Sequence, residues 1–329
     1  MKKIYYITAV FATLFLVGCG DGIDLPGVNV ETDLNKIPLP DNNVNLEQVE
    51  LKPSTEPMLH EGLHTEEDFQ RIRDKKAAGE EPWVSAYQLL VESQFSQKTA
   101  DTYPTEWIKR GVSGDENYMN AARGATIAYQ QALRWKIEQD DEYAAKAVEN
   151  LNKWVQTCVG VTGNTNLSLA AGLYGYEFAI AGELLRDYGG WDRADFAAFQ
   201  NWLLKVFYPA NDDFLKRHHD TNALHYWANW CLCNIAAKMA IGIVTDRRDI
   251  YNEGIAHLQT GDTNGRLRRA IYHDYAPDYN FAQWQESGRD QGHTLMCVGL
   301  MGVICQLAWS QGDDFFAYDD NLFLRACEY

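Results

Sequence analysis

Beyond residue 64 the chain consists mainly of long segments in which apolar residues recur every three or four positions. That spacing puts the apolar side chains on one face of a helix. Examples are "NYMNAARGATIAYQQALRWKIEQ" and "LSLAAGLYGYEFAIAGELLRDYG". Strict two-residue alternation, the mark of a half-buried strand, never extends beyond about four residues. The pattern therefore predicts an almost entirely helical protein.

Polar loops between the segments supply helix ends. Thr65 and Asp68, three residues apart, form a capping box at one helix start. We expect a single helix over residues 220–244 and another that starts at Glu286 or Ser287. Consecutive helices joined by short loops predict an all-α fold, a toroid or barrel of antiparallel helical hairpins. An incomplete toroid is expected, because the chain stops inside the helical run "RACEY".

The N-terminus has the features of a bacterial secretion signal. "MKK" is basic, and "ITAVFATLFLVG" is an apolar run too short to cross a bilayer comfortably. It ends in "LVGCG", which resembles a lipoprotein signal with Cys19 as the lipidated residue and predicts anchoring in the bacterial cell envelope. We expect a signal peptide over residues 1–18, a tether or extended arm over 19–60 and one toroid domain over 61–329. An uncleaved signal anchor is the alternative.

The net charge and the composition limit the classes of molecule that the chain is expected to bind. The formal net charge is −17 at pH 7, and cleavage of the signal would also remove Lys2 and Lys3. Such an acidic chain is not expected to bind nucleic acid. Ten Trp and eighteen Tyr favour a surface that stacks on sugars, although large helical proteins also use these rings in their cores. No Cys/His spacing typical of a metal site occurs, so we expect no metal or other cofactor, and a monomer.

Residues 218–230, "HHDTNALHYWANW", concentrate polar and aromatic rings. In a helix that starts near Asp220, side chains three and four residues apart share one face. That face would carry Asn222, His225, Tyr226 and Asn229. Such a face is either a buried polar network or the wall of a cleft. The basic "KRHH" that precedes it leaves the two interpretations evenly balanced.

A second segment, "RLRRAIYHDYAPDY", covers residues 266–279 and places Arg269 six residues before Tyr275. An ordinary surface loop with solvated arginines and packed tyrosines is one interpretation of it. The other is a ligand-binding loop in which the arginine and the tyrosine act together. The segment alone does not separate the two.

A third segment, "WQESGRDQGHT", precedes a long apolar run. Arg289, Gln291 and His293 would fall in the first turns of its helix, where free N–H groups and the helix dipole favour an anion. Arg289 and His293 would share one face of that helix. The alternative is a polar helix start in which Glu286 pairs with Arg289.

Asn, His, Tyr and Arg, without a nucleophile motif, fit β-elimination at a uronic acid. The chain has no GxSxG, P-loop or HExxH motif. Loss of the C5 proton builds negative charge on the neighbouring carboxylate, and each preorganised donor that neutralises it contributes about 3–4 kcal/mol. A positioned base takes this proton and a positioned acid protonates the leaving glycosidic oxygen, each contributing about 10²–10⁴ in rate.

Most of residues 61–329 resembles the helical-toroid polysaccharide lyases of the alginate-lyase type, in particular families 5 and 38, which cleave alginate and, in the latter, also glucuronan. The resemblance rests on "EGLHTEEDFQRIRDKKAAGEEPW", "NAARGATIAYQQALRWKI", "NALHYWANWCLCNIAAKMAIGI", "RRAIYHDYA" and "ESGRDQGHT". It implies that Asn222 and Arg269 neutralise the substrate carboxylate. His225 is implied as base and Tyr275 as acid, and as base too where the C5 proton lies on its side.

The resemblance also implies residues that bind the substrate or support the site. These are Arg289, Gln291, His293, His219, Tyr226, Asn229, Trp227 and Trp230. The chain departs from family 5, in which the Asn and His are adjacent, because His225 stands three residues after Asn222. His218 and His219 are therefore alternative bases, and the choice of polymer between alginate and a glucuronan-like chain stays open.

We thus expect an envelope lyase that cleaves an acidic, uronate-containing polysaccharide. One alternative is a toroid glycoside hydrolase, which needs two carboxyl groups about 5–10 Å apart. Its candidate carboxylates are Asp212, Asp213, Asp220, Asp274, Asp278 and Glu286. The other alternative is a non-catalytic glycan-binding lipoprotein on the cell surface.

Overall fold

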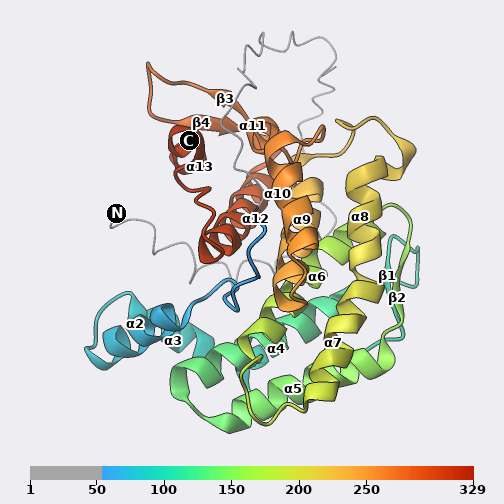
Figure 1. Ribbon diagram of the computed structural model, residues 1–329, viewed down its shortest axis with the longest axis vertical. Coiled ribbons are helices and arrows are strands. Elements are labelled where there is room, and N and C mark those ends of the chain that lie inside the picture. The colour runs from blue at the N-terminus through green and yellow to red at the C-terminus, as the bar shows by residue number, and fades with distance from the viewer. Residues whose placement is uncertain (1–53) are drawn as a thin grey trace, which may run out of the picture.

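A computed structural model describes residues 54–329; the predicted signal peptide, Cys19 and most of the predicted tether lie outside the described residues. The all-α class is confirmed, with antiparallel hairpins arranged around an inner row of helices (Figure 1). The inner helices are α4 (Tyr118–Glu138), α6 (Leu167–Leu184), α9 (Ala228–Val244) and α12 (Gln291–Ser310). The outer helices are α5 (Asp141–Thr157), α7 (Arg193–Val206), α8 (Tyr208–Arg217), α10 (Arg248–Thr260) and α13 (Tyr318–Ala326).

Short elements complete the fold. The remaining helices are α2 (Glu66–Ala77), α3 (Trp83–Glu92) and α11 (Leu267–Ala270), and the 3₁₀ turns are η3 (Gln94–Ser96), η4 (His218–Asp220) and η5 (Gln285–Gly288). The strands are β1 (Trp107–Arg110), β2 (Gly160–Gly163), β3 (Ile271–Asp274) and β4 (Ala282–Trp284). β1 pairs with β2 in parallel, and β3 pairs with β4 antiparallel. Each pair stands beside the N-terminal ends of inner helices (Figure 1).

Two of the inner helices, α6 and α9, are buried on nearly every side because their sequences are apolar all round. In α6 and α9 almost every residue is buried. The two helices approach closely at Gly172, where an added Cβ would lie only 2.5 Å from Sγ of Cys233. Several tryptophans, such as Trp154 and Trp202, belong to this core and not to a sugar-facing surface. Helix α12 is long and apolar enough to cross a membrane by composition, but packs against α9 within the fold.

Of two predicted helix starts, the structure confirms that of α2 and contradicts that of α9. Thr65 and Asp68 form the predicted capping box of α2. The predicted helix over residues 220–244 is wrong, because α9 begins only at Ala228. Before it, Asp220 has a positive φ of 60°, and Oδ1 of Asn222 accepts a hydrogen bond from a nearby backbone N–H. Such local side-chain bonds compete with helix formation.

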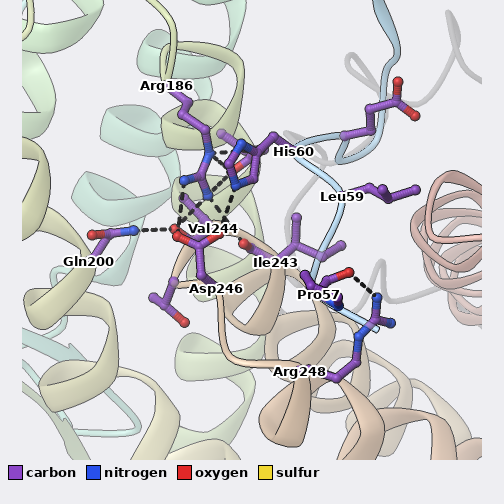
Figure 2. A network of polar contacts seen from close by, with 12 residues as sticks. Pro57, Leu59, His60, Arg186, Gln200, Ile243, Val244, Asp246 and Arg248 are labelled. Carbon is purple, nitrogen blue, oxygen red and sulfur yellow. Dashed lines mark hydrogen bonds and ion pairs between the residues drawn. The ribbon is translucent and has the colours of Figure 1, made fainter. Parts of the chain in front are cut away.

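The segment from residue 54 to 60 is the described end of the predicted arm, and it lies against the C-terminal ends of inner helices (Figure 2). Arg248 donates to the carbonyl oxygens of Glu56 and Pro57 at 2.8 and 2.9 Å. His60 Nε2 lies 3.0 Å from Oδ1 of Asp246, and Nη1 of Arg186 lies 3.2 Å from Oδ2 of the same carboxylate. The arm is thereby fixed to the turns that follow α6 and α9, on the side opposite their N-terminal ends.

Glu177 of α6 gives the core a pH-dependent stability. Its Oε2 atom is buried without a hydrogen-bond partner in the described part of the chain, and burial raises the pKa of this carboxyl to about 8. The unfolded chain releases this proton near the ordinary value of 4.5, so the folded state binds the extra proton between the two values. Stability from this group is therefore lost as pH rises towards 8.

We expect the free energy of unfolding of the wild type to fall by up to about 2 kcal/mol, relative to Glu177→Gln, between roughly pH 6.5 and 8, because one pKa unit corresponds to about 1.4 kcal/mol. The variant removes this proton equilibrium and leaves every other titrating group in place. Urea unfolding of both proteins at the two pH values measures the difference. Parallel pH curves for the two proteins would contradict the assignment.

Candidate active site

The turn before α9 presents two of the predicted residues to solvent. Oδ1 of Asn222 accepts a hydrogen bond from the backbone N–H of Leu224 at 2.8 Å, and the Asn222 carbonyl accepts one from His225 at 2.9 Å. Both side chains are exposed. The bond to Oδ1 fixes the amide so that its Nδ2 donor stays available. The predicted helical face is therefore replaced by a turn that exposes an amide and an imidazole three residues apart in sequence.

The three histidines of this segment have different surroundings. His218 is buried with Nε2 3.5 Å from Sγ of Cys231, and burial lowers its pKa. His219 is half-buried, and its Nε2 lies 3.0 Å from Oγ of Ser168. His225 is exposed, packs edge-on against a tyrosine ring at 4.9 Å, and makes no ring hydrogen bond to a described residue. Among these three rings, that of His225 is the one open to a ligand.

The aromatic rings of Tyr226 and Trp230, which follow this turn in sequence, pack against one another and against α8. Tyr226 is buried, and its ring centroid lies 4.7 Å from that of Trp230 and 5.7 Å from that of His219. Both Tyr226 and Trp230 also contact Phe214 of α8. Packing therefore explains these two rings, while the half-buried Trp227 is placed differently, against η5.

Glu286 of η5 fastens the third predicted segment onto the start of α9. Its carboxylate is fully buried and accepts hydrogen bonds from the backbone and side-chain nitrogens of Asn229 at 2.8 Å. The Glu286 carboxylate also forms an ion pair with Arg289 at 2.9 Å. The Arg289 guanidinium lies 5.2 Å from the ring of Trp227. A buried carboxylate held by several donors is a rigid anchor. Glu286 thus sets the position of Arg289 beside the turn.

The predicted start of α12 needs correction. The helix begins at Gln291 with Asp290 as N-cap, so Arg289 precedes it and does not share a helical face with His293. His293 is instead tied to Asp290, with Nδ1 2.6 Å from Oδ2, while Gln291 is exposed. The alternative interpretation, an ordinary polar helix start with a Glu286–Arg289 pair, accounts for this segment better.

Tyr275 stands at the end of β3. Its hydroxyl donates a hydrogen bond to Oε1 of Gln283 in β4 at 2.8 Å, and the ring of His273 packs edge-on at 4.4 Å. Burial raises the pKa of Tyr275, and the neighbouring Tyr329 acts in the same direction. The hydroxyl therefore keeps its proton at neutral pH. Nε2 of Gln283 also donates to Ser287 of η5 at 2.9 Å, which joins this strand pair to the Glu286 anchor.

Arg269 is turned away from Tyr275. Its Nη1 donates to the backbone carbonyl of Asp262. The preceding arginine, Arg268, pairs with Asp274 at 3.5 Å and with Asp319. No hydrogen bond between Arg269 and Tyr275 occurs in this part of the described chain. Arg269 and Tyr275 thus have separate partners among the described residues, and their joint action on a substrate stays a prediction.

The sequence segments thus form two groups joined by η5. One contains the turn residues Asn222 and His225 with Arg289 over its tryptophan, and the other contains Tyr275 with its glutamine partner. Sequence reasoning missed the linking role of Gln283 and Glu286, because their partners lie far along the chain. No group of three or more His, Cys, Asp or Glu residues able to hold a metal ion occurs among residues 54–329.

Five of the six carboxylates considered for a hydrolase are engaged in ion pairs. Their cationic partners are Lys216 and Lys238 for Asp212, Arg217 for Asp213 and Asp220, Arg325 for Asp274, and Arg289 for Glu286. An ion-paired carboxylate is held in its charged form and is a poor general acid. This arrangement gives no support to an acid–base pair of carboxyl groups.

Glu286→Gln is expected to raise KM about tenfold and to destabilise the fold by about 3 kcal/mol, because one partner of a buried ion pair is lost. Glu183→Gln is the matched control, since Glu183 is buried and pairs with Arg186 at the same i,i+3 spacing away from the site. It should lower stability without changing KM. Steady-state kinetics and thermal unfolding measure both; equal KM values for the two variants would contradict a positioning role for Glu286.

Comparisons with known proteins agree with this picture. A family model described as alginate lyase matches residues 72–329. Alginate lyase A1-III from Sphingomonas species A1 has a similar structure, with a TM-score of 0.55 at 13% identity over 80% of this chain and 75% of that chain. Two variants of alginate lyase A1-III complexed with tetrasaccharide, one tyrosine-to-phenylalanine and one histidine-to-alanine, give the same TM-score at 14% and 13% identity, over 80% of this chain and 75% and 74% of theirs. At such identity the likeness establishes the helical-toroid fold alone. No curated protein matches the chain.

Proposed function

The chain belongs to the alginate lyase family and is a polysaccharide lyase, and on that premise we propose that it cleaves alginate or a similar polyuronate by β-elimination at the site around Asn222, His225 and Tyr275. The observation that carries the proposal is the exposed turn before α9, where a free amide donor and a free imidazole stand within the family match. The complexes of the solved relatives with tetrasaccharide support an acidic oligosaccharide as ligand.

In this mechanism His225 removes the C5 proton of the uronate. The electron pair of the C5–H bond forms the C4–C5 double bond, and the bond from C4 to the glycosidic oxygen breaks. Charge that develops on the neighbouring carboxylate is stabilised by donors that are already in place, an effect of about 3–4 kcal/mol for each donor. Nδ2 of Asn222 is such a donor, since its amide is held by the hydrogen bond from Leu224.

Tyr275 supplies the proton that the leaving oxygen needs. A tyrosine hydroxyl carries its proton at neutral pH, as a general acid requires, and burial raises the pKa of Tyr275 further. We therefore assign proton donation to Tyr275 and proton removal to His225, whose imidazole is exposed. Arg289, anchored by Glu286, is the better-placed guanidinium for the substrate carboxylate, and Arg269 would first have to leave the carbonyl of Asp262.

Isotope labelling distinguishes this reaction from hydrolysis. Digestion of a polyuronate in ¹⁸O-labelled water, followed by mass spectrometry, should give products without the label, because β-elimination breaks the C–O bond without adding water. Labelled, saturated products would show that the site is a hydrolase. Binding without any product would support a glycan-binding role instead.

A further inference from the structure

Arg110, at the end of β1, is a buried cation without a charged partner among residues 54–329. Only 6% of its surface is exposed, and its guanidinium lies 4.6 Å from the ring of Tyr118. Its Nη1 atom is buried with no hydrogen-bond partner, and among residues 54–329 no carboxylate lies within ion-pair distance of it. None of the sequence motifs drew attention to this residue.

The backbone directs Arg110 towards the inner helices. β1 pairs with β2 so that Arg110 faces Gly163, where an added Cβ would lie 1.7 Å from the Arg110 carbonyl oxygen. This close approach carries the chain from β2 directly into the first turn of α6. Burial raises the pKa of Cys233 in α9, and the charge of Arg110 opposes that shift, so the guanidinium is close to α9 as well.

The candidate active site borders the first turn of α6, close to Arg110. Ser168, in the first turn of α6, lies 3.0 Å from the ring of His219. In Figure 1 the β1–β2 pair and the β3–β4 pair flank the N-terminal ends of the inner helices, with the segment between α8 and α9 lying between them. The strand pair that contains Arg110 thus lies on one side of this segment, and the strand pair next to Tyr275 lies on the other.

A comparison with Arg134 shows what Arg110 lacks. Arg134 is also 6% exposed and lies 4.4 Å from a tyrosine ring, that of Tyr143. It pairs with Glu138 and is hydrogen-bonded to the Tyr143 hydroxyl at 2.5 Å. Burying a charge is costly unless a counter-charge and hydrogen bonds compensate it. For Arg110 the described residues supply the ring alone, so its buried charge lacks the compensation that Arg134 has.

We propose that Arg110 binds the carboxylate of a uronate residue neighbouring the one at which elimination occurs. The proposal rests on the proposed function and names a specificity-determining residue for it. A planar guanidinium matches a carboxylate through two parallel hydrogen bonds. The ring of Tyr118, itself stacked on Tyr174 at 6.5 Å, holds that plane in place. The substrate class is thus a chain with consecutive uronates, and a neutral sugar next to the cleaved bond is disfavoured.

The test compares Arg110→Gln with the matched control Arg134→Gln. For Arg110→Gln we expect KM on a polyuronate to rise about 10–100-fold with kcat changed less than about threefold, since a hydrogen bond to a charged group contributes about 1.5–3 kcal/mol. Its melting temperature should not fall, because no partner in the described chain is left behind. Arg134→Gln should lower the melting temperature and leave KM unchanged.

A polyuronate with part of its carboxyl groups reduced to alcohols gives a second readout, on which the KM difference between wild type and Arg110→Gln should shrink. An unchanged KM for Arg110→Gln, or a lowered melting temperature alone, would overturn the proposal while the wild type still cleaves the polymer. If Arg110→Gln does not fold, Arg110→Lys keeps the charge without the planar fork and must itself raise KM. If the wild type neither cleaves nor binds any polyuronate, the proposed function has failed, and the role of Arg110 fails with it.

Discussion

Replacing Tyr275 with phenylalanine is expected to lower kcat by about 10²–10⁴-fold, the usual contribution of a positioned general acid. The substitution removes the hydroxyl that would protonate the leaving oxygen and keeps the ring that packs on His273. The substitution also removes the hydrogen bond to Gln283, which contributes about 1 kcal/mol to stability. Steady-state kinetics on a polyuronate, with circular dichroism to confirm the fold, measures the effect.

Tyr279→Phe is the matched control for this variant. Tyr279 lies in the same loop after β3, is 61% exposed and stacks on Phe281. Its loss should change kcat by less than about threefold, because it is assigned no proton transfer. Full activity in Tyr275→Phe, or an equal loss in the two variants, would remove Tyr275 from the mechanism.

Replacing His225 with glutamine is also expected to lower kcat by about 10²–10⁴-fold, because it removes the base that takes the C5 proton. His225 is exposed on a turn, so its loss should leave the melting temperature unchanged. His219→Gln is the comparison, since the amide can still hydrogen-bond to Ser168. We expect that variant to keep kcat within about tenfold of the wild type.

The opposite order of effects would identify His219 as the working imidazole. For His219 to act as the base, its ring would have to give up its contact with Ser168. Loss of that contact in the Ser168→Ala variant should then change KM. Equal, small effects of both histidine substitutions would assign proton abstraction to another group.

Much of the fold was predictable because local and global preferences agree. Helices α6 and α9 are apolar on nearly every side, so their burial follows from their sequence alone. The capping box at Thr65 is a local signal of three residues, and it is present in the structure. The lack of long alternating runs likewise predicted an almost entirely helical protein, and each strand among the described residues is three or four residues long.

The site was less predictable because its geometry depends on contacts distant in sequence. The start of α9 is determined by the Asn222 turn and by Glu286, which lies 57 residues after Asn229. A helical pattern cannot reveal that partner, so the helix was predicted to begin too early. Arg110 shows the same limit, since only the structure reveals that a buried arginine lacks a carboxylate.

The central claim is that this chain performs β-elimination on a polyuronate. The most direct measurement is the ultraviolet absorbance of the product, because the new C4–C5 double bond is conjugated to the carboxylate and absorbs where the substrate does not. The purified wild type should produce a steady rise in absorbance on alginate or on glucuronan, and the rise should disappear in Tyr275→Phe. No rise on any polyuronate across neutral and alkaline pH, with the protein folded, would contradict the account.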